Sequence, residues 1–290
     1  MVIRLMMAAF LALTPAALEA QGGLLVVAHG ANKGWNDRVR ETVQNVTWDG
    51  PVAIAFLMGA EADSLGWDAG VARLVSEGAR EITVVPLMVS SHGSHYRQIR
   101  FYAGELPSLP PELAQHDHGT HSPPPVPMRV TPALDDAPEF AAALSARWRA
   151  MAEADRSRPL LLVAHGPNDP DDAVEWLEDI GSVSAGLRTA TGRDLFVGLL
   201  RDDAPAPVRA RAVAAMRDSV LAMAQRSGDS VVALPVMISS GSITRIKIPA
   251  DLAGLPIRYH AEPLAPLPEL SRWIERVGRA AAATERAEAR

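Results

Sequence analysis

Four of the eight histidines and one glutamate stand directly after short apolar stretches of the chain. They are His29, Glu61, His92, His95 and His165. Imidazole nitrogens bind divalent transition metals and exchange protons near neutral pH, and a carboxylate can accept a proton or orient a metal ligand. Because the chain has no cysteine, any transition-metal site must use histidine, carboxylate, methionine or backbone ligands. The residue types therefore indicate metal binding or proton transfer.

His29 and Glu61 are the predicted catalytic residues, and His29 is also a predicted metal ligand. Gly30 allows a sharp turn that leaves the imidazole of His29 accessible. The alternative for His29 is a cap on the following helix, and His165, in the same Ala-His-Gly context, shares that alternative. Glu61 can take a proton or orient a ligand, or it can stabilise the start of the helix expected near Asp63.

The turn Ser-Ser-His-Gly-Ser-His at residues 90–95 supplies two more predicted metal ligands, His92 and His95. Their spacing lets both side chains face one centre where a turn enters a helix. Two nitrogen donors suit cobalt, nickel, iron or zinc. The alternative is a turn that binds phosphate or carboxylate through backbone N–H and hydroxyl groups. The equivalent turn in the second half has no histidine, which favours the first half as the metal side.

Residues in and around these turns are the predicted substrate-binding set. Arginines after the turns could pair with substrate carboxylates, although solvation at the surface is the alternative for each of them. Arg245 and Lys247, which follow the equivalent Ser-Ser turn of the second half, could likewise pair with substrate carboxylates or be solvated at the surface. The set comprises Ser90, Ser91, Gly93, Ser94, Arg97, Arg100, His165, Ser239, Ser240 and Gly241.

A Pro- and His-rich stretch at residues 107–127 interrupts the regular pattern. Its prolines exclude a regular helix or strand, so we expect a long surface loop. The loop carries His116, His118 and His121, which could gather a loosely held metal or could simply be solvated.

Three sequence blocks recur in the same order in the two halves of the chain. Residues 24–37 resemble 160–173, residues 52–63 resemble 194–205, and residues 82–94 resemble 231–243. We therefore predict two homologous lobes, 21–135 and 158–290, joined by a connecting helix at 136–157.

Each lobe alternates apolar runs with stretches of helical periodicity. Continuous Val/Leu/Ile runs are typical of strands buried on both faces, and alternating strands and helices predict an α/β fold with a small parallel sheet in each lobe. Ligands of such sheets bind beyond the carboxyl ends of the strands. The predicted strands are 24–28, 52–58, 82–89, 127–131, 160–164, 195–200, 230–238 and 256–260, and the predicted helices include 64–79, 137–154, 172–190 and 206–226.

The overall composition fits a globular protein with a leader. The chain has 290 residues, 48% hydrophobic and 21% charged, and a net charge of −6, which gives no general attraction to nucleic acid. Residues 1–20 have the order of a secretory signal peptide: Arg4, an apolar run, then small residues up to Ala20. The run is short for a membrane span, so we expect an exported, periplasmic protein without a stable span once the leader is removed. If residues 1–20 are instead a first buried helix, a cytoplasmic protein is expected.

Three motifs of the first half resemble the sirohydrochlorin cobaltochelatase family of class II tetrapyrrole chelatases. They are LLVVAHG at 24–30, AFLMGAEADSL at 55–65 and GAREITVVPLMVSSHGSHYRQI at 78–99. The second half resembles the family more weakly, so the whole chain is similar to the long, two-lobe form. The resemblance implies ATP-independent insertion of a divalent metal, most simply cobalt but also nickel or iron, into a tetrapyrrole such as sirohydrochlorin. It also implies that the tetrapyrrole lies in a cleft between the lobes. It implies no organic cofactor.

The resemblance also assigns site residues. His29 matches the family's first metal-binding histidine, and Glu61 matches its acidic residue. Counted from Pro86, the second family histidine falls on Ser94, and a shift of one residue puts His95 in that place, with His92 as the other candidate.

Two other functions remain open from the sequence. The first is an exported metal- or tetrapyrrole-binding protein without turnover, which the leader and the displaced second histidine favour. The second is a two-lobe phosphate or sugar binder that uses the Ser-Ser turns. Two fused lobes with pseudo-twofold symmetry are compatible with a monomer.

Overall fold

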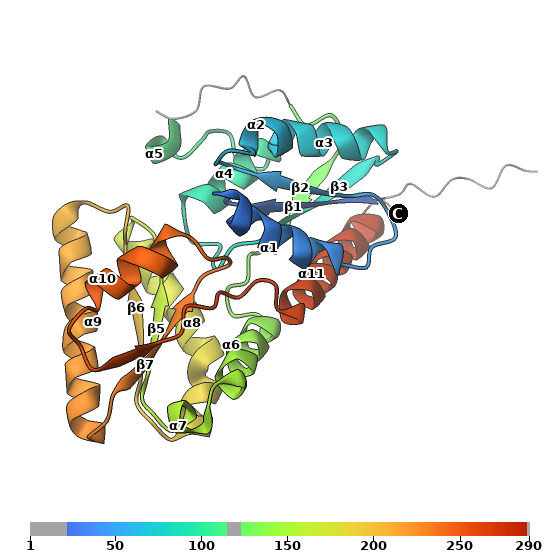
Figure 1. Ribbon diagram of the computed structural model, residues 1–290. Helices are drawn as coiled ribbons and strands as arrows, with labels where there is room; N and C mark the ends of the chain where they lie inside the picture. Colours follow the sequence, from blue (N-terminus) through green and yellow to red (C-terminus); the bar gives the residue numbers. More distant parts are fainter. Residues whose placement is uncertain (1–21, 115–122, 289–290) are drawn as a thin grey trace, which may run out of the picture.

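The computed structural model describes residues 22–114 and 123–288, with side chains up to residue 284. The predicted leader, and the loop histidines His116, His118 and His121, lie outside the described residues. Figure 1 shows two α/β lobes side by side, as the internal repeat predicts.

Each lobe contains a four-stranded parallel sheet, which confirms the predicted fold class. The first sheet has the order β2-β1-β3-β4 and the second the order β6-β5-β7-β8, so the two sheets have the same topology. The first sheet consists of β1 (Gly22–Ala28), β2 (Val52–Phe56), β3 (Glu81–Pro86) and β4 (Met128–Val130). The second consists of β5 (Leu160–Ala164), β6 (Leu195–Leu199), β7 (Val231–Val236) and β8 (Ile257–Tyr259).

Strand β1 shows why the apolar runs form parallel sheet. It pairs with β2 on one side and β3 on the other, and its side chains alternate between two apolar clusters. Leu24 and Val26 enter one cluster and Leu25 and Val27 the other, and all four are fully buried. A strand with both faces covered needs no polar residue.

Helices cover both faces of each sheet, close to the predicted positions. Proline at the first turn and glycine or asparagine at the ends mark several boundaries. The first half contains α1 (Lys33–Gln44), α2 (Ala62–Leu65), α3 (Trp67–Ser76), α4 (Ser94–Tyr102), α5 (Pro111–Ala114), α6 (Pro138–Ala150) and α7 (Glu153–Arg156). The second contains α8 (Pro170–Thr191), α9 (Ala206–Ser227), the π-helix η1 (Ile243–Lys247), α10 (Ile248–Asp251) and α11 (Pro268–Glu288).

Two details of the helices differ from the sequence prediction. The stretch 107–127, expected to lack helix, contains the one-turn helix α5, because Pro111 occupies the first helical position, where its missing N–H costs nothing. The connection at 136–157 consists of two helices, α6 and α7, separated where Met151 adopts an extended conformation. Among the residues that the structure describes, no helix is long and apolar enough to cross a membrane.

The last helix of each lobe packs between the two lobes. Helix α11, at the end of the chain, packs against α1 and β3 of the first lobe, and α6 packs against α8 of the second. Ser271 of α11 donates to the Thr42 carbonyl over 2.8 Å, and Arg147 of α6 donates to the Pro235 carbonyl of β7. One apolar cluster therefore includes residues of both sheets.

Candidate active site between the lobes

His29 stands immediately after β1, where the chain turns sharply. Gly30 has φ +83°, and a Cβ atom there would lie 2.2 Å from the Met58 carbonyl oxygen, so only glycine fits the turn. The His29 residue is exposed, and Trp35 of α1 lies beside it at a ring-centroid distance of 6.4 Å.

The structure brings His29 and His95 together. Their rings meet edge to face with centroids 5.0 Å apart and an interplanar angle of 86°. His95 reaches this position from the first turn of α4, which begins at Ser94. A single ion could therefore contact both imidazoles after small side-chain rotations.

The hydrogen bonds of both rings leave the same nitrogen free. Nδ1 of His29 lies 2.8 Å from the Gly30 carbonyl oxygen, and Nδ1 of His95 lies 3.1 Å from Oε1 of Gln98, whose amide donates to Tyr102. Because these oxygens only accept, we assign the proton of each ring to Nδ1. Each Nε2 then carries a lone pair, and the bonded Nδ1 fixes the ring, as in protein metal sites.

Both rings are electrically neutral at pH 7. His29 is exposed at its surface, but burial among the surrounding protein atoms and then the neighbouring His95 lower its pKa to about 4. Burial also lowers the pKa of His95. Since only neutral imidazole binds a metal, the pair is ready to do so without losing protons.

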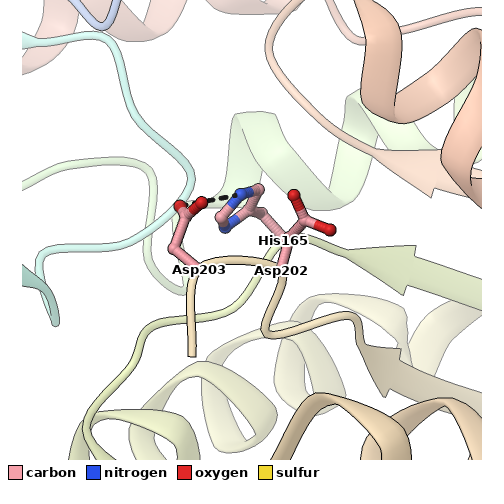
Figure 2. Close-up of side chains that lie close together, drawn as sticks. All are labelled: His165, Asp202 and Asp203. Atoms are coloured by element: carbon pink, nitrogen blue, oxygen red, sulfur yellow. Dashed lines mark ion pairs between the residues drawn. The ribbon is translucent and has the colours of Figure 1, made fainter. Parts of the chain in front are cut away.

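Two residues of the second lobe face this pair. His165 follows β5 as His29 follows β1, and its Nε2 lies 3.4 Å from the Asp203 carboxylate (Figure 2). His165 and Asp203 are close enough to shift the pKa values of both His29 and His95: the imidazole lowers them and the carboxylate raises them. Two histidines from one lobe thus lie near a His–Asp pair from the other.

Asp202, next to Asp203, is paired with positive side chains. His165, Asp202 and Asp203 place potential metal-binding atoms within 4.8 Å of one another. However, Arg209 donates to Asp202 over 3.0 Å and Lys247 also pairs with it. A metal on this trio would have to compete with two positive side chains, so we do not assign the trio as a metal site.

Glu61, a predicted catalytic residue, is held inside the first lobe. Asn36 donates to its carboxylate over 2.6 Å and Arg40 forms an ion pair with the same oxygen. The hydrogen bond from Asn36 and then the bond and charge of Arg40 lower its pKa. Glu61 occupies the N-cap position of α2 but makes no capping hydrogen bond. It is a neutralised anion rather than a free base.

His92, the other predicted ligand of the turn, faces helix α8 and not the His29–His95 pair. Its Nε2 lies 4.0 Å from the Asp179 carboxylate, and its carbonyl accepts a hydrogen bond from Trp176. Burial, with the nearby Asp135, raises the pKa of Asp179 to about 6.

The serines of the predicted substrate set are bonded within the protein. Ser90 donates to Asp179 over 3.3 Å, and Ser91 donates to Asp135 over 2.6 Å. Ser239 donates to the Trp35 carbonyl over 3.0 Å, joining the second turn to the first lobe. Further along these turns, Ser240 bonds Thr244, Gly93 and Ser94 start α4, and Gly241 packs near Trp35.

Both predicted arginines form ion pairs within the protein. Arg97 binds both oxygens of Asp172 on α8, over 3.1 and 2.9 Å, and Arg100 binds Glu105 over 2.9 Å. In the second turn, Lys247 forms an ion pair with Asp202, whereas Arg245 donates a hydrogen bond to the neutral hydroxyl of Ser240. Neither Asp172 nor Asp202 was predicted as a site residue, because nothing in the sequence pairs residues so far apart.

A cavity of about 590 Å³ lies beside Arg97 at the junction of the lobes. Residues 106–112 of the first lobe and 168–170 of the second line it. The charge of Glu112, in the wall of this cavity, is among the contributions that raise the pKa of His95.

Comparisons with known proteins agree on one class. Residues 23–151 match the family model described as CbiX. SirB from Bacillus subtilis with Fe³⁺ is similar to the chain with a TM-score of 0.62 and 16% identity, over 92% of this chain and 98% of that one. No curated protein sequence matches the chain.

Two further solved structures are similar. The sirohydrochlorin chelatase SirB from Bacillus subtilis subspecies spizizenii in complex with cobalt gives a TM-score of 0.56 and 15% identity, over 92% and 97% of the two chains. CbiX, the terminal enzyme of siroheme biosynthesis in denitrifying bacteria, gives a TM-score of 0.53 and 18% identity, over 89% of this chain and 99% of that one.

The fold is therefore that of a two-lobe chelatase. The family model matches the first lobe, and the similarity to the solved chelatase structures extends over both lobes.

Proposed function

We propose that this protein inserts a divalent metal ion into a tetrapyrrole of the sirohydrochlorin type, without ATP or an organic cofactor. The observation that carries the proposal is the His29–His95 pair, whose two rings meet at 5.0 Å in the cleft with both Nε2 lone pairs free. The similar structures support it, since one holds Fe³⁺ and another holds cobalt.

The chemistry of insertion needs a partly dehydrated metal and a deprotonated ring. The two Nε2 atoms of the pair replace water on the incoming ion, and their neutral state avoids competition with protons. The flat macrocycle enters between the lobes and presents its nitrogens to the ion. We propose cobalt as the metal, although histidine donors also suit nickel and iron.

The test is a metallation assay with purified protein, sirohydrochlorin and Co²⁺, followed by the absorbance of the macrocycle. We expect many turnovers per protein molecule, and loss of turnover in His29→Ala and in His95→Ala. A wild-type rate equal to that of the reaction without protein would overturn the proposal.

A second candidate is an exported metal- or tetrapyrrole-binding protein without turnover. The ion pair of Glu61 with Arg40 favours it, because the acidic residue assigned by the resemblance is not free to act. Under this alternative, the absorbance change of the macrocycle would be proportional to the protein concentration. It would stop once one macrocycle per protein molecule had reacted.

We also propose that the protein is exported as a monomer after removal of residues 1–20. N-terminal sequencing of the protein from a periplasmic extract, with its mass in solution, tests both points. An intact Met1 in the cytoplasmic fraction would contradict export, and the mass of two chains would contradict the monomer.

A further inference from the structure

The turns after β3 and β7 each carry an arginine at an equivalent backbone position. In the first lobe the N–H of Arg97 donates to the Gly93 carbonyl over 3.2 Å. In the second lobe the N–H of Arg245 donates to the Gly241 carbonyl over 3.1 Å. Each arginine therefore follows the glycine of its turn by the same number of residues, at the carboxyl end of its sheet, where ligands of parallel sheets bind.

The opposite lobe neutralises only one of these two arginines. Arg97 donates to both carboxylate oxygens of Asp172 over 3.1 and 2.9 Å. Asp172 is the third residue after Asp169, the N-cap of α8. On α1 the third residue after the N-cap, Asn32, is Trp35. The position that neutralises an arginine on one side of the molecule is thus an uncharged indole on the other.

Arg245 keeps most of its hydrogen-bonding capacity. The residue is exposed, and its Nε donates to the Ser240 hydroxyl over 3.2 Å. No carboxylate in the part of the chain that the structure describes forms an ion pair with it. Ser240 is 6% exposed and also bonds Thr244, so it holds the guanidinium in place. The two terminal nitrogens are left with the planar spacing that binds both oxygens of one carboxylate.

The neighbouring positive side chains of the second lobe are already occupied. Lys247 and Arg209 both pair with Asp202. Arg201 donates through Nε and a terminal nitrogen to backbone carbonyls of the loop after β5. Of these four cations, Arg245 is the one that can bind an anion without giving up an ion pair or a pair of hydrogen bonds.

Trp35 connects the turn that carries Arg245 to the metal-binding pair. The Ser239 hydroxyl donates to the Trp35 carbonyl over 3.0 Å, and the indole lies 3.5 Å from where a Cβ on Gly241 would stand. The same indole lies beside His29, with ring centroids 6.4 Å apart. A macrocycle whose nitrogens face the ion at His29 therefore has peripheral groups on the side of this turn.

We propose that Arg245 binds a carboxylate at the edge of the macrocycle and so fixes which way round the ring enters the protein. This inference rests on the proposed function and names the anionic subsite of the same site. Because Asp172 neutralises Arg97 and nothing equivalent neutralises Arg245, the two sides of the site differ in charge. Binding of this kind is equal in the ground state and the transition state, so its loss raises KM and leaves kcat unchanged.

The experiment compares Arg245→Ala and Arg245→Lys with Arg193→Ala. Arg193 is exposed and precedes β6, so its loss removes the same charge at the opposite end of the second sheet. Binding of metal-free sirohydrochlorin is followed by absorbance, and Co²⁺ insertion gives kcat and KM. We expect Kd and KM to rise about tenfold in Arg245→Ala, as for loss of a charge-assisted pair. A rise of about threefold is expected in Arg245→Lys, which keeps the charge but not the planar fork.

The control values separate binding from chemistry. Arg193→Ala should match wild type, and kcat and the affinity for Co²⁺ alone should stay within about twofold in every variant. Sirohydrochlorin with its carboxylates converted to methyl esters should bind wild type and Arg245→Ala equally, because an ester has no charge for the guanidinium to neutralise. An arginine that only maintained the shape of the turn would affect the acid and the ester alike.

Three results would overturn the inference. They are a Kd of Arg245→Ala within about twofold of that of Arg193→Ala, an equal loss of affinity for the acid and the ester, and no binding of sirohydrochlorin by wild type. Failure of the proposed function is distinct, because wild type would then bind sirohydrochlorin without turnover and the comparison of Kd values would still decide. If Arg245→Ala does not fold, Arg245→Gln, which can still donate to Ser240, takes its place.

Discussion

Arg97 of α4 donates to both carboxylate oxygens of Asp172 on α8, and this ion pair joins the two lobes beside the cavity of about 590 Å³. Glu112 lies 3.5 Å from the same guanidinium. The ion pair holds the two lobes together next to this cavity and neutralises a positive charge that an anionic macrocycle would otherwise meet.

The first prediction concerns this link. Asp172→Asn should lower the free energy of unfolding by less than about 1 kcal/mol, because partly exposed ion pairs contribute little. It should also lower KM for the polycarboxylate substrate, since Arg97 is released. Urea unfolding and steady-state kinetics measure the two effects. A raised KM would show that the link positions the lobes for binding.

The second prediction separates the three histidines predicted as metal ligands. His29→Ala and His95→Ala should each lower Co²⁺ affinity at least about tenfold, because each removes one of two nitrogen donors. His92→Ala is the matched control, since its ring faces Asp179, and its affinity should match that of wild type. Titration calorimetry with Co²⁺ alone measures this, and equal losses in all three variants would place the metal elsewhere.

The third prediction is the pH dependence of metal binding. The pKa of His29 is lowered to about 4 from 6.5 by crowding and by His95, so the ring stays neutral at pH 5. Co²⁺ binding should therefore weaken mainly as the pH falls through 4, lower than for an ordinary histidine. Co²⁺ titrations at several pH values measure this, and a loss of half of the binding already at pH 6.5 would contradict the prediction.

The same shift affects stability. An unfolded chain protonates His29 near pH 6.5, whereas the native protein does so near 4. Between these values the unfolded state binds more protons, so the free energy of unfolding falls as the pH is lowered through this window. His29→Gln should flatten that dependence in urea unfolding curves recorded at several pH values.

The fourth prediction concerns Glu61. Because Arg40 and Asn36 already occupy its carboxylate, Glu61→Gln should reduce kcat less than about threefold, in contrast to the roughly 100-fold or larger loss expected for a general base. Metallation kinetics measure the rate. A loss of two orders of magnitude would mean that Arg40 releases the carboxylate when the substrate binds.

The fifth prediction tests the turn that presents His29. Gly30→Ala should destabilise the protein by roughly 2–4 kcal/mol, since it combines a left-handed backbone with a contact to the Met58 carbonyl. Gly78→Ala is the control: its φ is +96°, and nothing lies within 4 Å of the added Cβ, so a cost of about 1 kcal/mol is expected. Equal losses of stability in the two variants would show that the contact between the added Cβ and the Met58 carbonyl relaxes.

The sequence predicted the strands and the topological repeat well, because buried parallel strands have an unmistakable apolar pattern. It also placed His29 correctly at a strand end. It could not decide between His92 and His95, since that depends on where α4 begins: with its start at Ser94, the first turn carries His95 toward His29 and leaves His92 outside.

The ion pairs were beyond sequence reasoning. Arg97, Arg100, Lys247 and Glu61 all looked available for substrate or protons, yet each is held by a partner. Long charged side chains form ion pairs with residues that the tertiary fold brings near, and the spacing of residues along the chain does not indicate these partners. Asp203 was recognisable as the counterpart of Glu61 from the internal repeat, but its contact with His165 was not.

The exchange of α6 and α11 between the lobes has a consequence for how such a chain could arise. Two separate copies that traded their last helices would form an intertwined homodimer, and joining them end to end would preserve every contact. Once they were covalently joined, the copies no longer had to be identical, so one could lose its second histidine while the other retained both. Cutting the chain between its halves would strip each half of the helix that completes its apolar core.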